Sequence, residues 1–187
     1  TQNRMTATEF SDGRRTLRSR DAETKPLLLC GALCNNAYFE ANGTGNGEPT
    51  ELALLNAAKE ASLCSPMPDT RYRRTAEFPF DSARKCMSTV HLLSGRAPAP
   101  LPVMPDDTYG FMVCKGAPEV VLSRCIALYD NGALTPLPAP LRQTLTEYCN
   151  DCADRALRVL AIAYRPLPDT DYRKLTEREC NSSDAEK

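Results

Sequence analysis

Three strand-like segments that follow one another without a helical pattern between them constrain the fold of this chain most. They are Thr75 to Phe80, Cys86 to Leu93 and Tyr109 to Lys115, separated by polar or proline-rich breaks. Arg96 to Asp107 contains four prolines and is expected to join two neighbouring strands as an extended loop. Consecutive strands without regular βαβ alternation predict an antiparallel sheet.

Helical patterns lie on both sides of this region. Leu and Ala recur at helical spacing over Thr24 to Ala37 and Thr50 to Ser62, and Leu141 to Ala156 is amphipathic. Ala117 to Arg124 predicts a short helix with Pro118 in its first turn. The mixed order predicts an α+β fold, in which helices flank an antiparallel twisted β-sheet.

The second half of the chain adds two strand signals. Ile126 to Tyr129 and Ala133 to Leu137 flank a turn, Asp130-Asn131-Gly132, and together indicate a hairpin. Arg158 to Tyr164 is the most apolar strand candidate. Glu177 to Lys187 is polar and is expected to fray.

Length and charge limit the class of protein. A chain of 187 residues has room for one well-buried domain, and its net charge of -1 gives no indication of a nucleic-acid partner or an anionic membrane surface. The longest apolar stretch, Leu27 to Leu33, is far shorter than the roughly 20 residues of a membrane-spanning helix, so no direct membrane insertion is expected. The sequence begins at Thr1 in mid-pattern, which indicates a piece of a longer chain. Such a piece is expected to be a monomer.

The cysteines and the single histidine indicate neither a metal site nor a catalytic centre. Nine cysteines without regular spacing fit reduced thiols in a cytosolic protein. Cys149 and Cys152 form a CxxC pair, but neither a second pair nor a nearby histidine completes a zinc set. His91 follows the apolar alternation of Val90 and Leu92, so a strand position is favoured over a catalytic role.

A glycine-rich segment, Asn42 to Gly47, is expected to be a surface loop. A dinucleotide-binding GxGxxG loop follows a strand and opens a helix, whereas here Ala41 precedes the glycines and their spacing differs. The sequence therefore does not support a dinucleotide site.

Six short segments occur in a fixed order with plausible gaps. They are Thr1 to Thr6, Leu33 to Ala37, Gly47 to Leu54, Phe80 to Ser88, Lys115 to Glu119, and Arg158 to Ala163. In this order they resemble the nucleotide-binding (N) domain of type II P-type cation-transporting ATPases, the calcium-pump-like branch. The resemblance runs nearly end to end. It implies that the phosphorylated aspartate of the family lies just upstream of Thr1.

The resemblance implies an ATP site. Phe80 stands where the family stacks adenine, and Lys85 would face the same pocket across the intervening turn. Lys115 would line the pocket floor, Gly116 would let the backbone approach the ligand, and Ala117 precedes the helix whose amino end favours negative charge. The alternatives are core packing for Phe80 and ordinary strand-end positions for the two lysines.

Five further residues are assigned to the site by resemblance. Glu51 would lie beside the adenine amino group, and Arg158 would reach the phosphate end. Met87 and Leu160 would supply apolar walls, whereas Ser82 stands where many calcium pumps carry an arginine, which puts a phosphate contact there in doubt. An exposed helix-start carboxylate and a strand-edge charge are the alternatives for Glu51 and Arg158.

The implied function is ATP binding at the cytosolic face of a membrane-embedded pump. Residues 1–10 would be a hinge from the phosphorylation domain, 11–175 the nucleotide-binding domain, and 176–187 a C-terminal hinge or frayed tail. The domain would present the γ-phosphate of Mg-ATP to an aspartate of the phosphorylation domain, in concert with the actuator domain. No catalytic residue is expected here, because the Mg²⁺ carboxylates of the family belong to that neighbouring domain. Calcium is the ion implied by the branch, and sodium, potassium and proton transport remain open.

Two other classes of function stay open from the sequence. One is a non-catalytic interaction module with a degenerate nucleotide site, in which the proline-rich loop and cysteine-rich helices dock a partner. The other is a free-standing kinase-like enzyme, which would need a carboxylate base and a phosphate loop that the sequence does not supply.

Overall fold

The computed structural model describes residues 5, 7, 9–11, 15–63, 71–93, 101–130 and 132–184, with side chains as far as Glu177. Most of the predicted hinge at residues 1–10, Asn131 of the predicted turn, the first part of the proline-rich loop and residues 185–187 lie outside the described residues. Within the described part of the chain, no helix combines the length and the hydrophobicity that crossing a membrane requires.

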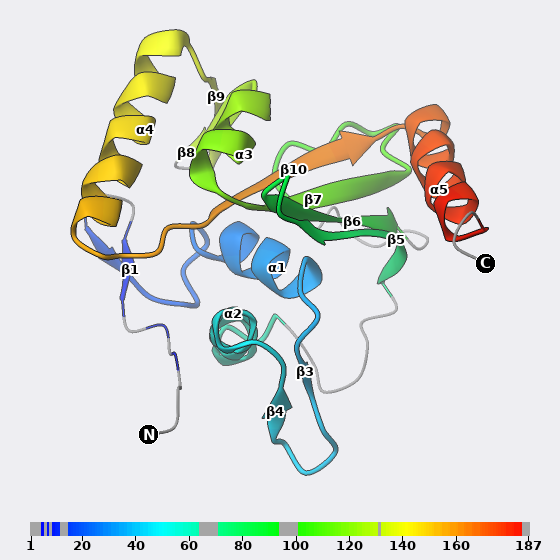
Figure 1. The fold of residues 1–187 in the computed structure, drawn as a ribbon, viewed down its shortest axis with the longest axis horizontal. Coiled ribbons are helices and arrows are strands. Elements are labelled where there is room, and N and C mark those ends of the chain that lie inside the picture. The colour runs from blue at the N-terminus through cyan, green and yellow to red at the C-terminus, as the bar shows by residue number, and fades with distance from the viewer. Residues whose placement is uncertain are drawn as a thin grey trace.

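Four antiparallel strands form the central sheet (Figure 1). They are β5 (Tyr72–Asp81), β6 (Cys86–Leu93), β7 (Gly110–Gly116) and β10 (Ala161–Leu167), in the order β10-β7-β6-β5. The α+β fold is confirmed, and β6 has the bounds that the sequence predicted. β5 begins three residues earlier than expected, because Tyr72 and its neighbours pair with the far end of β6.

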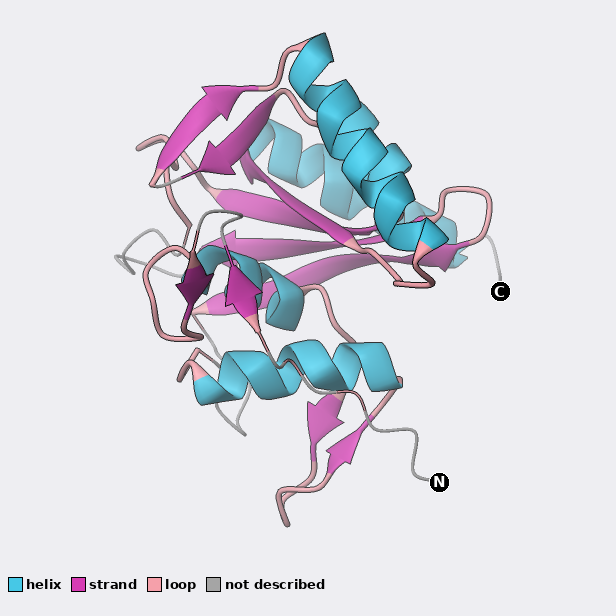
Figure 2. Ribbon diagram, turned by 90° about the vertical axis from the view of Figure 1, so that its left-hand side faces the viewer, coloured by secondary structure: helices cyan, strands magenta, loops and turns pink. Residues whose placement is uncertain are grey.

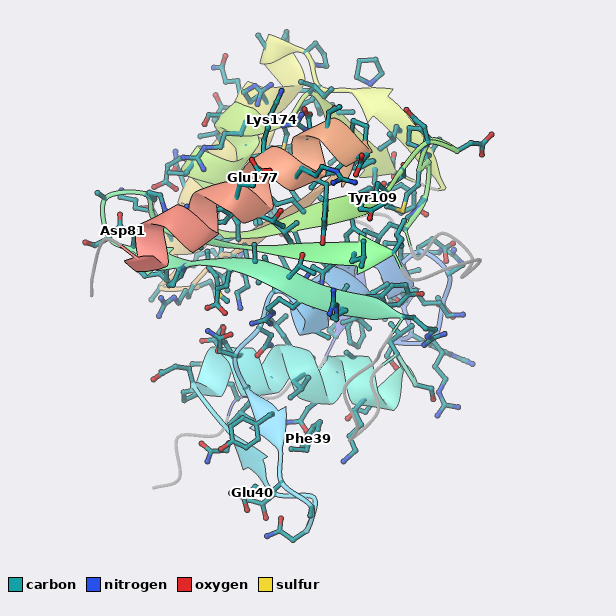
Figure 3. The ribbon with its side chains drawn as sticks, turned by 90° about the vertical axis from the view of Figure 1, so that its right-hand side faces the viewer. Phe39, Glu40, Asp81, Tyr109, Lys174 and Glu177 are labelled. Atoms are coloured by element: carbon teal, nitrogen blue, oxygen red, sulfur yellow. The ribbon has the colours of Figure 1, made fainter. Side chains whose placement is uncertain are left out.

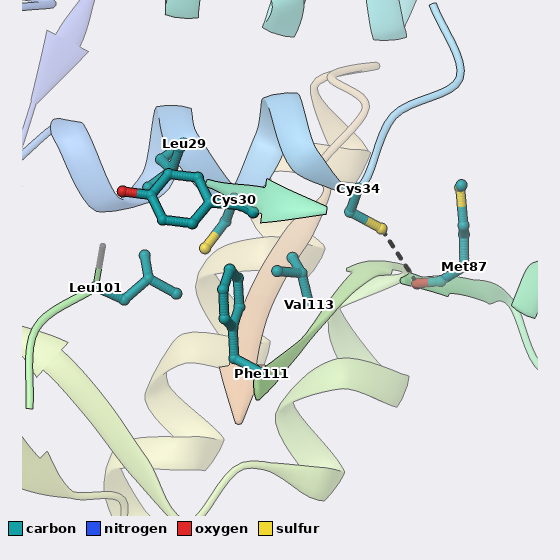
Figure 4. Close-up of a cluster of buried hydrophobic side chains, with 8 residues drawn as sticks. Leu29, Cys30, Cys34, Met87, Leu101, Phe111 and Val113 are labelled. Carbon is teal, nitrogen blue, oxygen red and sulfur yellow. Dashed lines mark hydrogen bonds between the residues drawn. The ribbon is translucent and has the colours of Figure 1, made fainter. Parts of the chain in front are cut away.

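Helices cover both faces of this sheet (Figure 2). One face packs against α1 (Lys25–Leu33), and α2 (Pro49–Glu60) lies behind α1. The core on this side joins Leu29, Cys30 and Cys34 from α1 and its end to Phe111 and Val113 of β7 (Figure 4). The opposite face is covered by α3 (Pro118–Arg124) and α5 (Asp169–Asp184).

Within the described residues, three small two-stranded hairpins complete the fold. They are β1–β2 (Phe10–Ser11 with Thr16–Leu17), β3–β4 (Tyr38–Phe39 with Gly45–Asn46) and β8–β9 (Ala127–Asp130 with Ala133–Pro136). The hairpin predicted around Asp130 is confirmed as β8–β9. The glycine-rich segment forms the tip of β3–β4 and part of its second strand, where Gly43 has a φ of 85°.

Two boundaries differ from the sequence prediction because of how helices end. The first helix was predicted to reach Ala37, but α1 ends at Leu33, and the Asn35 side chain then accepts a hydrogen bond from the Ala37 amide. The last strand was predicted over Arg158 to Tyr164, but β10 begins three residues later.

The cause of the β10 shift is the end of α4 (Ala139–Asp154). Ala156 adopts a φ of 59°, and the Leu157 amide donates to the Cys152 carbonyl oxygen at 2.9 Å. This is the Schellman arrangement that closes many helices. It uses the residues that follow α4, so extended pairing starts only at Ala161.

The sequence prediction missed α5, whose backbone is helical through Asp184 and therefore runs across the domain boundary placed at residue 176. Its polar composition gives a weak signal. Among its described side chains, those of Tyr172 and Leu175 contact the sheet-side core of Val90 and Leu167. A side chain at Gly110 would collide with the Tyr172 ring at 2.6 Å. Gly110 therefore leaves the space in which α5 docks, and Figure 3 shows α5 lying across the sheet.

Candidate functional site

A β-bulge at the end of β5 sets the position of Phe80. Phe78 pairs with Ser88 and Asp81 with Cys86, so Pro79 and Phe80 together lie opposite one residue of β6, Met87. Because Phe80 directly precedes Asp81, the alternation of side chains along a strand favours the sheet face that carries Met87 for Phe80. Phe80 is 64% exposed, which excludes the core-packing alternative.

The turn between β5 and β6 carries the next two predicted residues. The Asp81 carboxylate accepts hydrogen bonds from the amides of Ala83 (3.0 Å) and Arg84 (2.8 Å), and the Lys85 amide donates to the Asp81 carbonyl oxygen at 2.6 Å. Lys85 adopts a φ of 51°, a backbone conformation that costs energy for a residue with a side chain. Ser82 is exposed at this turn.

The Lys85 side chain is exposed and lies near a carboxylate. Its Nζ atom is 3.3 Å from Oε1 of Glu119, in the first turn of α3. The pKa of Glu119 is lowered, first by a hydrogen bond from its own backbone amide and then by Lys85. Because the Lys85 side chain is exposed, its ammonium group could bind an incoming anion after separating from Glu119.

Lys115 and Glu51 form a sheltered ion pair. Lys115 lies near the end of β7, between Met87 of β6 and Ile162 of β10, and its Nζ atom is 2.8 Å from Oε1 of Glu51. The side chains are 8% and 18% exposed, respectively. Lys115 is thus not an ordinary solvated strand-end lysine, and Glu51 is not a free helix-start carboxylate.

The segment after α1 holds Glu51 in place. The Asn36 amide donates to Glu51 Oε2 at 3.3 Å, and the Asn35 side-chain amide donates to the Glu51 carbonyl oxygen at 2.9 Å. Arg74 of β5 in turn donates to the carbonyl oxygens of Leu33 and Asn35, at 2.8 and 2.5 Å. The carboxylate is therefore oriented by contacts from β5 through the α1–β3 connection.

Close backbone packing joins the end of β7 to the β5–β6 turn. A side chain at Gly116 would lie 2.7 Å from Cys86 Cα and would also collide with the Lys85 carbonyl oxygen. The Ala117 amide donates to that same oxygen at 3.0 Å. Gly116 and Ala117 thus fix the turn that carries Lys85, in addition to the role that resemblance assigned to them.

Arg158 and Leu160 lie in the connection between α4 and β10. Both precede β10, and Arg158 is exposed. Leu160 is half-buried and immediately precedes Ala161, which pairs with Gly116. The structure thus brings Leu160 to the neighbourhood of β7, whereas Arg158 lies in the connection from α4.

His91 offers no acid or base to this site. Its Nδ1 donates to the Tyr72 carbonyl oxygen at 3.1 Å, and the Thr89 hydroxyl therefore donates to Nε2 at 2.9 Å. Burial lowers the pKa of His91 to about 4, with Arg74 contributing and the Tyr72 carbonyl opposing. The predicted strand position is confirmed. Among the described residues, no three His, Cys, Asp or Glu side chains gather as metal ligands.

Sequence reasoning missed the side chains that hold the site together. Arg74, Asn36 and Glu77 form one network, in which Arg74 donates to Asn36 Oδ1 at 2.8 Å and to Glu77 Oε2 at 3.0 Å. Arg84 donates to backbone carbonyls on both sides of the turn. Arg84 and Asn36 lie inside two of the six motifs, which could have marked them as site residues. Their hydrogen-bond partners could not be predicted, because folding brings those partners together.

The arrangement combines an exposed aromatic ring, an exposed cation and a sheltered, charge-balanced pair. A flat heterocycle with polar edges and an anionic tail is the kind of ligand that such groups can bind. The site is therefore suited to binding, and the chemistry of transfer would need further groups.

Comparison with known proteins identifies the family of the chain. The family model described as P-type ATPase, cytoplasmic domain N, matches residues 23–187. The calcium-transporting ATPase of Bacillus subtilis (strain 168) is 33% identical over 191 residues, covering 89% of this chain and 20% of that protein. Calcium-transporting ATPase 1 of Lactococcus lactis subsp. lactis (strain IL1403) is 33% identical over 175 residues, covering 90% and 18%.

A more distant relative is the sodium/potassium-transporting ATPase subunit alpha-3 of Homo sapiens, 27% identical over 158 residues that cover 80% of this chain and 15% of that protein. The chain thus spans about a fifth or less of the length of these relatives. The match to the family model nevertheless extends over most of the chain. The chain belongs to the family of the cytoplasmic N domain of P-type ATPases.

Proposed function

We propose that this chain is the ATP-binding domain of a calcium-transporting P-type ATPase. It would lie at the cytosolic face of the pump and present the γ-phosphate of Mg-ATP to an aspartate of the neighbouring phosphorylation domain, with the actuator domain as a further partner. The names of the bacterial relatives, both calcium-transporting ATPases, support the choice of ion.

The observation that carries this proposal is the exposed Phe80 ring in the bulge opposite Met87, the β6 residue that pairs with Lys115 of the sheltered Lys115–Glu51 pair. Phe80 would stack on adenine, an interaction worth about 1–3 kcal/mol in stacked nucleic-acid sites. Glu51 would accept from the adenine amino group, and Lys85 would leave Glu119 to contact phosphate. Met87, Leu160, Gly116 and Ala117 would line the site.

The domain would bind ATP without hydrolysing it. Phosphoryl transfer depends on in-line positioning and on Mg²⁺, and the resemblance assigns the magnesium carboxylates and the acceptor aspartate to the neighbouring domain. With half of the cleft on this chain, we expect a Kd of about 0.1 to a few mM.

Titration of the chain with ATP by NMR tests the proposal. Phe80→Ala should weaken binding about ten-fold, because the adenine loses its stacking partner. Tyr148→Ala is the matched control, since Tyr148 on α4 is 65% exposed and lies outside the site. An unchanged spectrum at about 10 mM ATP would contradict the proposal.

Two further outcomes would favour the other classes of function. Lys115→Ala should weaken ATP binding, whereas an interaction module with a degenerate site would show no change. ATP consumption by the purified wild-type chain would support a kinase-like enzyme instead.

A further inference from the structure

Arg84 bridges the two strands that flank the β5–β6 turn. Its Nη2 atom donates to the carbonyl oxygens of Phe78 (3.1 Å), Pro79 (2.7 Å) and Cys86 (3.2 Å). The first two acceptors belong to β5 and the third to β6. One guanidinium therefore ties both strands together at the bulge.

The bulge explains why a donor is needed there. The pairing shifts between Phe78 and Asp81, so the regular ladder of hydrogen bonds is interrupted at Pro79 and Phe80, and proline has no N–H to contribute. Backbone carbonyls away from the ladder need other donors. The guanidinium plane fixes the directions of its N–H donors, whereas the three N–H donors of a lysine ammonium rotate freely.

The opposite side of the same turn is fixed by Asp81. Its carboxylate accepts from the Ala83 and Arg84 amides, so residue 84 is held by both its backbone and its side chain. Phe80 and Lys85 lie immediately on either side of this doubly held segment. A change in the conformation of Arg84 would therefore act on the segment that joins Phe80 to Lys85.

We propose that Arg84 is the positioning residue of the nucleotide site. It holds the bulge in the shape that leaves Phe80 exposed on the face of Met87 and Lys115, and it acts through Phe80 and Lys85 without contacting the ligand. This inference rests on the proposed function, because it assigns Arg84 a role in ATP binding.

A double-mutant cycle on the 187-residue chain tests the inference, with adenosine and ATP as separate ligands. Arg84→Ala should weaken binding of both about five-fold or more, and Arg84→Lys should restore only part of the loss. Phe80→Ala added to Arg84→Ala should cost little more, because the ring is already misplaced. The matched control is Arg73→Ala, which removes the same charge from an exposed position of β5 and should leave adenosine binding at the wild-type level.

Two results would overturn the inference. One is adenosine affinity of folded Arg84→Ala equal to that of wild type. The other is independent, multiplicative losses for Arg84→Ala and Phe80→Ala. Thermal unfolding establishes that each variant is folded, and Arg84→Lys, which keeps the charge, serves for the comparison if the alanine variant does not fold.

A ligand-free measurement separates this inference from the proposed function. Backbone amide resonances of residues 78–87 should move in Arg84→Lys while those of α5 stay in place. If wild type bound neither ligand at about 10 mM, the proposed function would fall. Unchanged resonances at the bulge in Arg84→Lys would instead overturn the positioning role of Arg84.

Discussion

Lys115 and Glu51 lie where water has little access, so each charge depends on the other. Removing an ammonium or a carboxylate from water costs several kcal/mol, and a partner with good geometry offsets that cost. The 2.8 Å contact and the Asn36 amide together satisfy the Glu51 carboxylate. The two charges offset each other, which in the proposed ATP site would suit the uncharged nucleoside part of the ligand.

Breaking this pair should destabilise the fold. Glu51→Gln keeps the shape of the side chain but leaves the Lys115 cation sheltered and uncompensated, so the free energy of unfolding should fall by about 3 kcal/mol. The double variant Glu51→Gln/Lys115→Met removes both charges and should recover most of the loss. Urea denaturation measures both values, and a change under about 0.5 kcal/mol in the single variant would contradict the prediction.

Glu119 should compete with ligand phosphates for Lys85. Like any exposed glutamate it is ionised at neutral pH, and Glu119→Gln removes this competitor from the exposed cation. ATP affinity should rise about two- to five-fold, and adenosine affinity should not change. Calorimetric titration of both ligands decides the question.

The matched control for this charge change is Glu40→Gln. Glu40 follows β3 and, as Figure 3 shows, lies at the far end of the β3–β4 hairpin from Asp81. It changes the net charge equally, so an equal rise in ATP affinity would assign the effect to overall charge and contradict a specific role of Glu119.

At the scale of elements, β6 is an interior strand of the four-stranded sheet, and helices pack on both faces of that sheet. It pairs with β5 on one side and β7 on the other, and its residues from Cys86 to His91 are buried on both faces. A strand covered on both faces has a continuous run of buried residues. This run of buried residues explains why the bounds of β6 were predictable. Separately, Gly116 lies so close to the backbone of Lys85 and Cys86 that an additional atom would collide with it.

Gly116→Ala should therefore be destabilising. The new methyl group would meet the backbone of Lys85 and Cys86, which cannot move without opening the β6–β7 pairing, so we expect a loss of about 2 kcal/mol or more. Gly31→Ala in α1 is the matched control. Its methyl group would meet the Leu54 side chain at 3.4 Å, and alanine favours the helix. Thermal unfolding of both variants tests this, and equal stability of the two would contradict the prediction.

At the scale of the whole molecule, His91 lies in the middle of the sheet and stacks on Phe111, with ring centroids 5.3 Å apart. The interior holds it in the neutral form, because burial dominates the lowering of its pKa. The unfolded chain, with an ordinary histidine pKa of 6.5, binds a proton first as the pH falls. The stabilisation from His91 is thus complete above about pH 6.5 and is lost progressively toward pH 4.

The pH dependence of the free energy of unfolding should reflect the protonation of His91. Between pH 7 and pH 5, wild type should lose about 2 kcal/mol more than His91→Gln, which retains hydrogen-bonding groups but does not titrate. Denaturation by urea at a series of pH values measures the difference. Parallel pH profiles of the two proteins would contradict the neutral, buried state of His91.

The missed and shifted elements have a common cause. The described part of α5 contacts the sheet through Tyr172 and Leu175 in a mostly polar segment, and Gly110, far away in the sequence, makes the space for Tyr172. Likewise, the apolar run from Arg158 does not reveal that Ala156 and Leu157 first close α4. Local patterns do not contain these packing partners.

The sequence by itself determined the α+β class, the strand β6, the β8–β9 hairpin and the helix start at Pro118, since these depend on neighbours within a few residues. Resemblance supplied Phe80 and Lys115 as site residues, and their roles remain predictions. Only the tertiary structure decided that Lys115 pairs with Glu51, 64 residues away, and that Arg84 holds the bulge. Such contacts are set by sheet register and helix packing, which bring distant residues together.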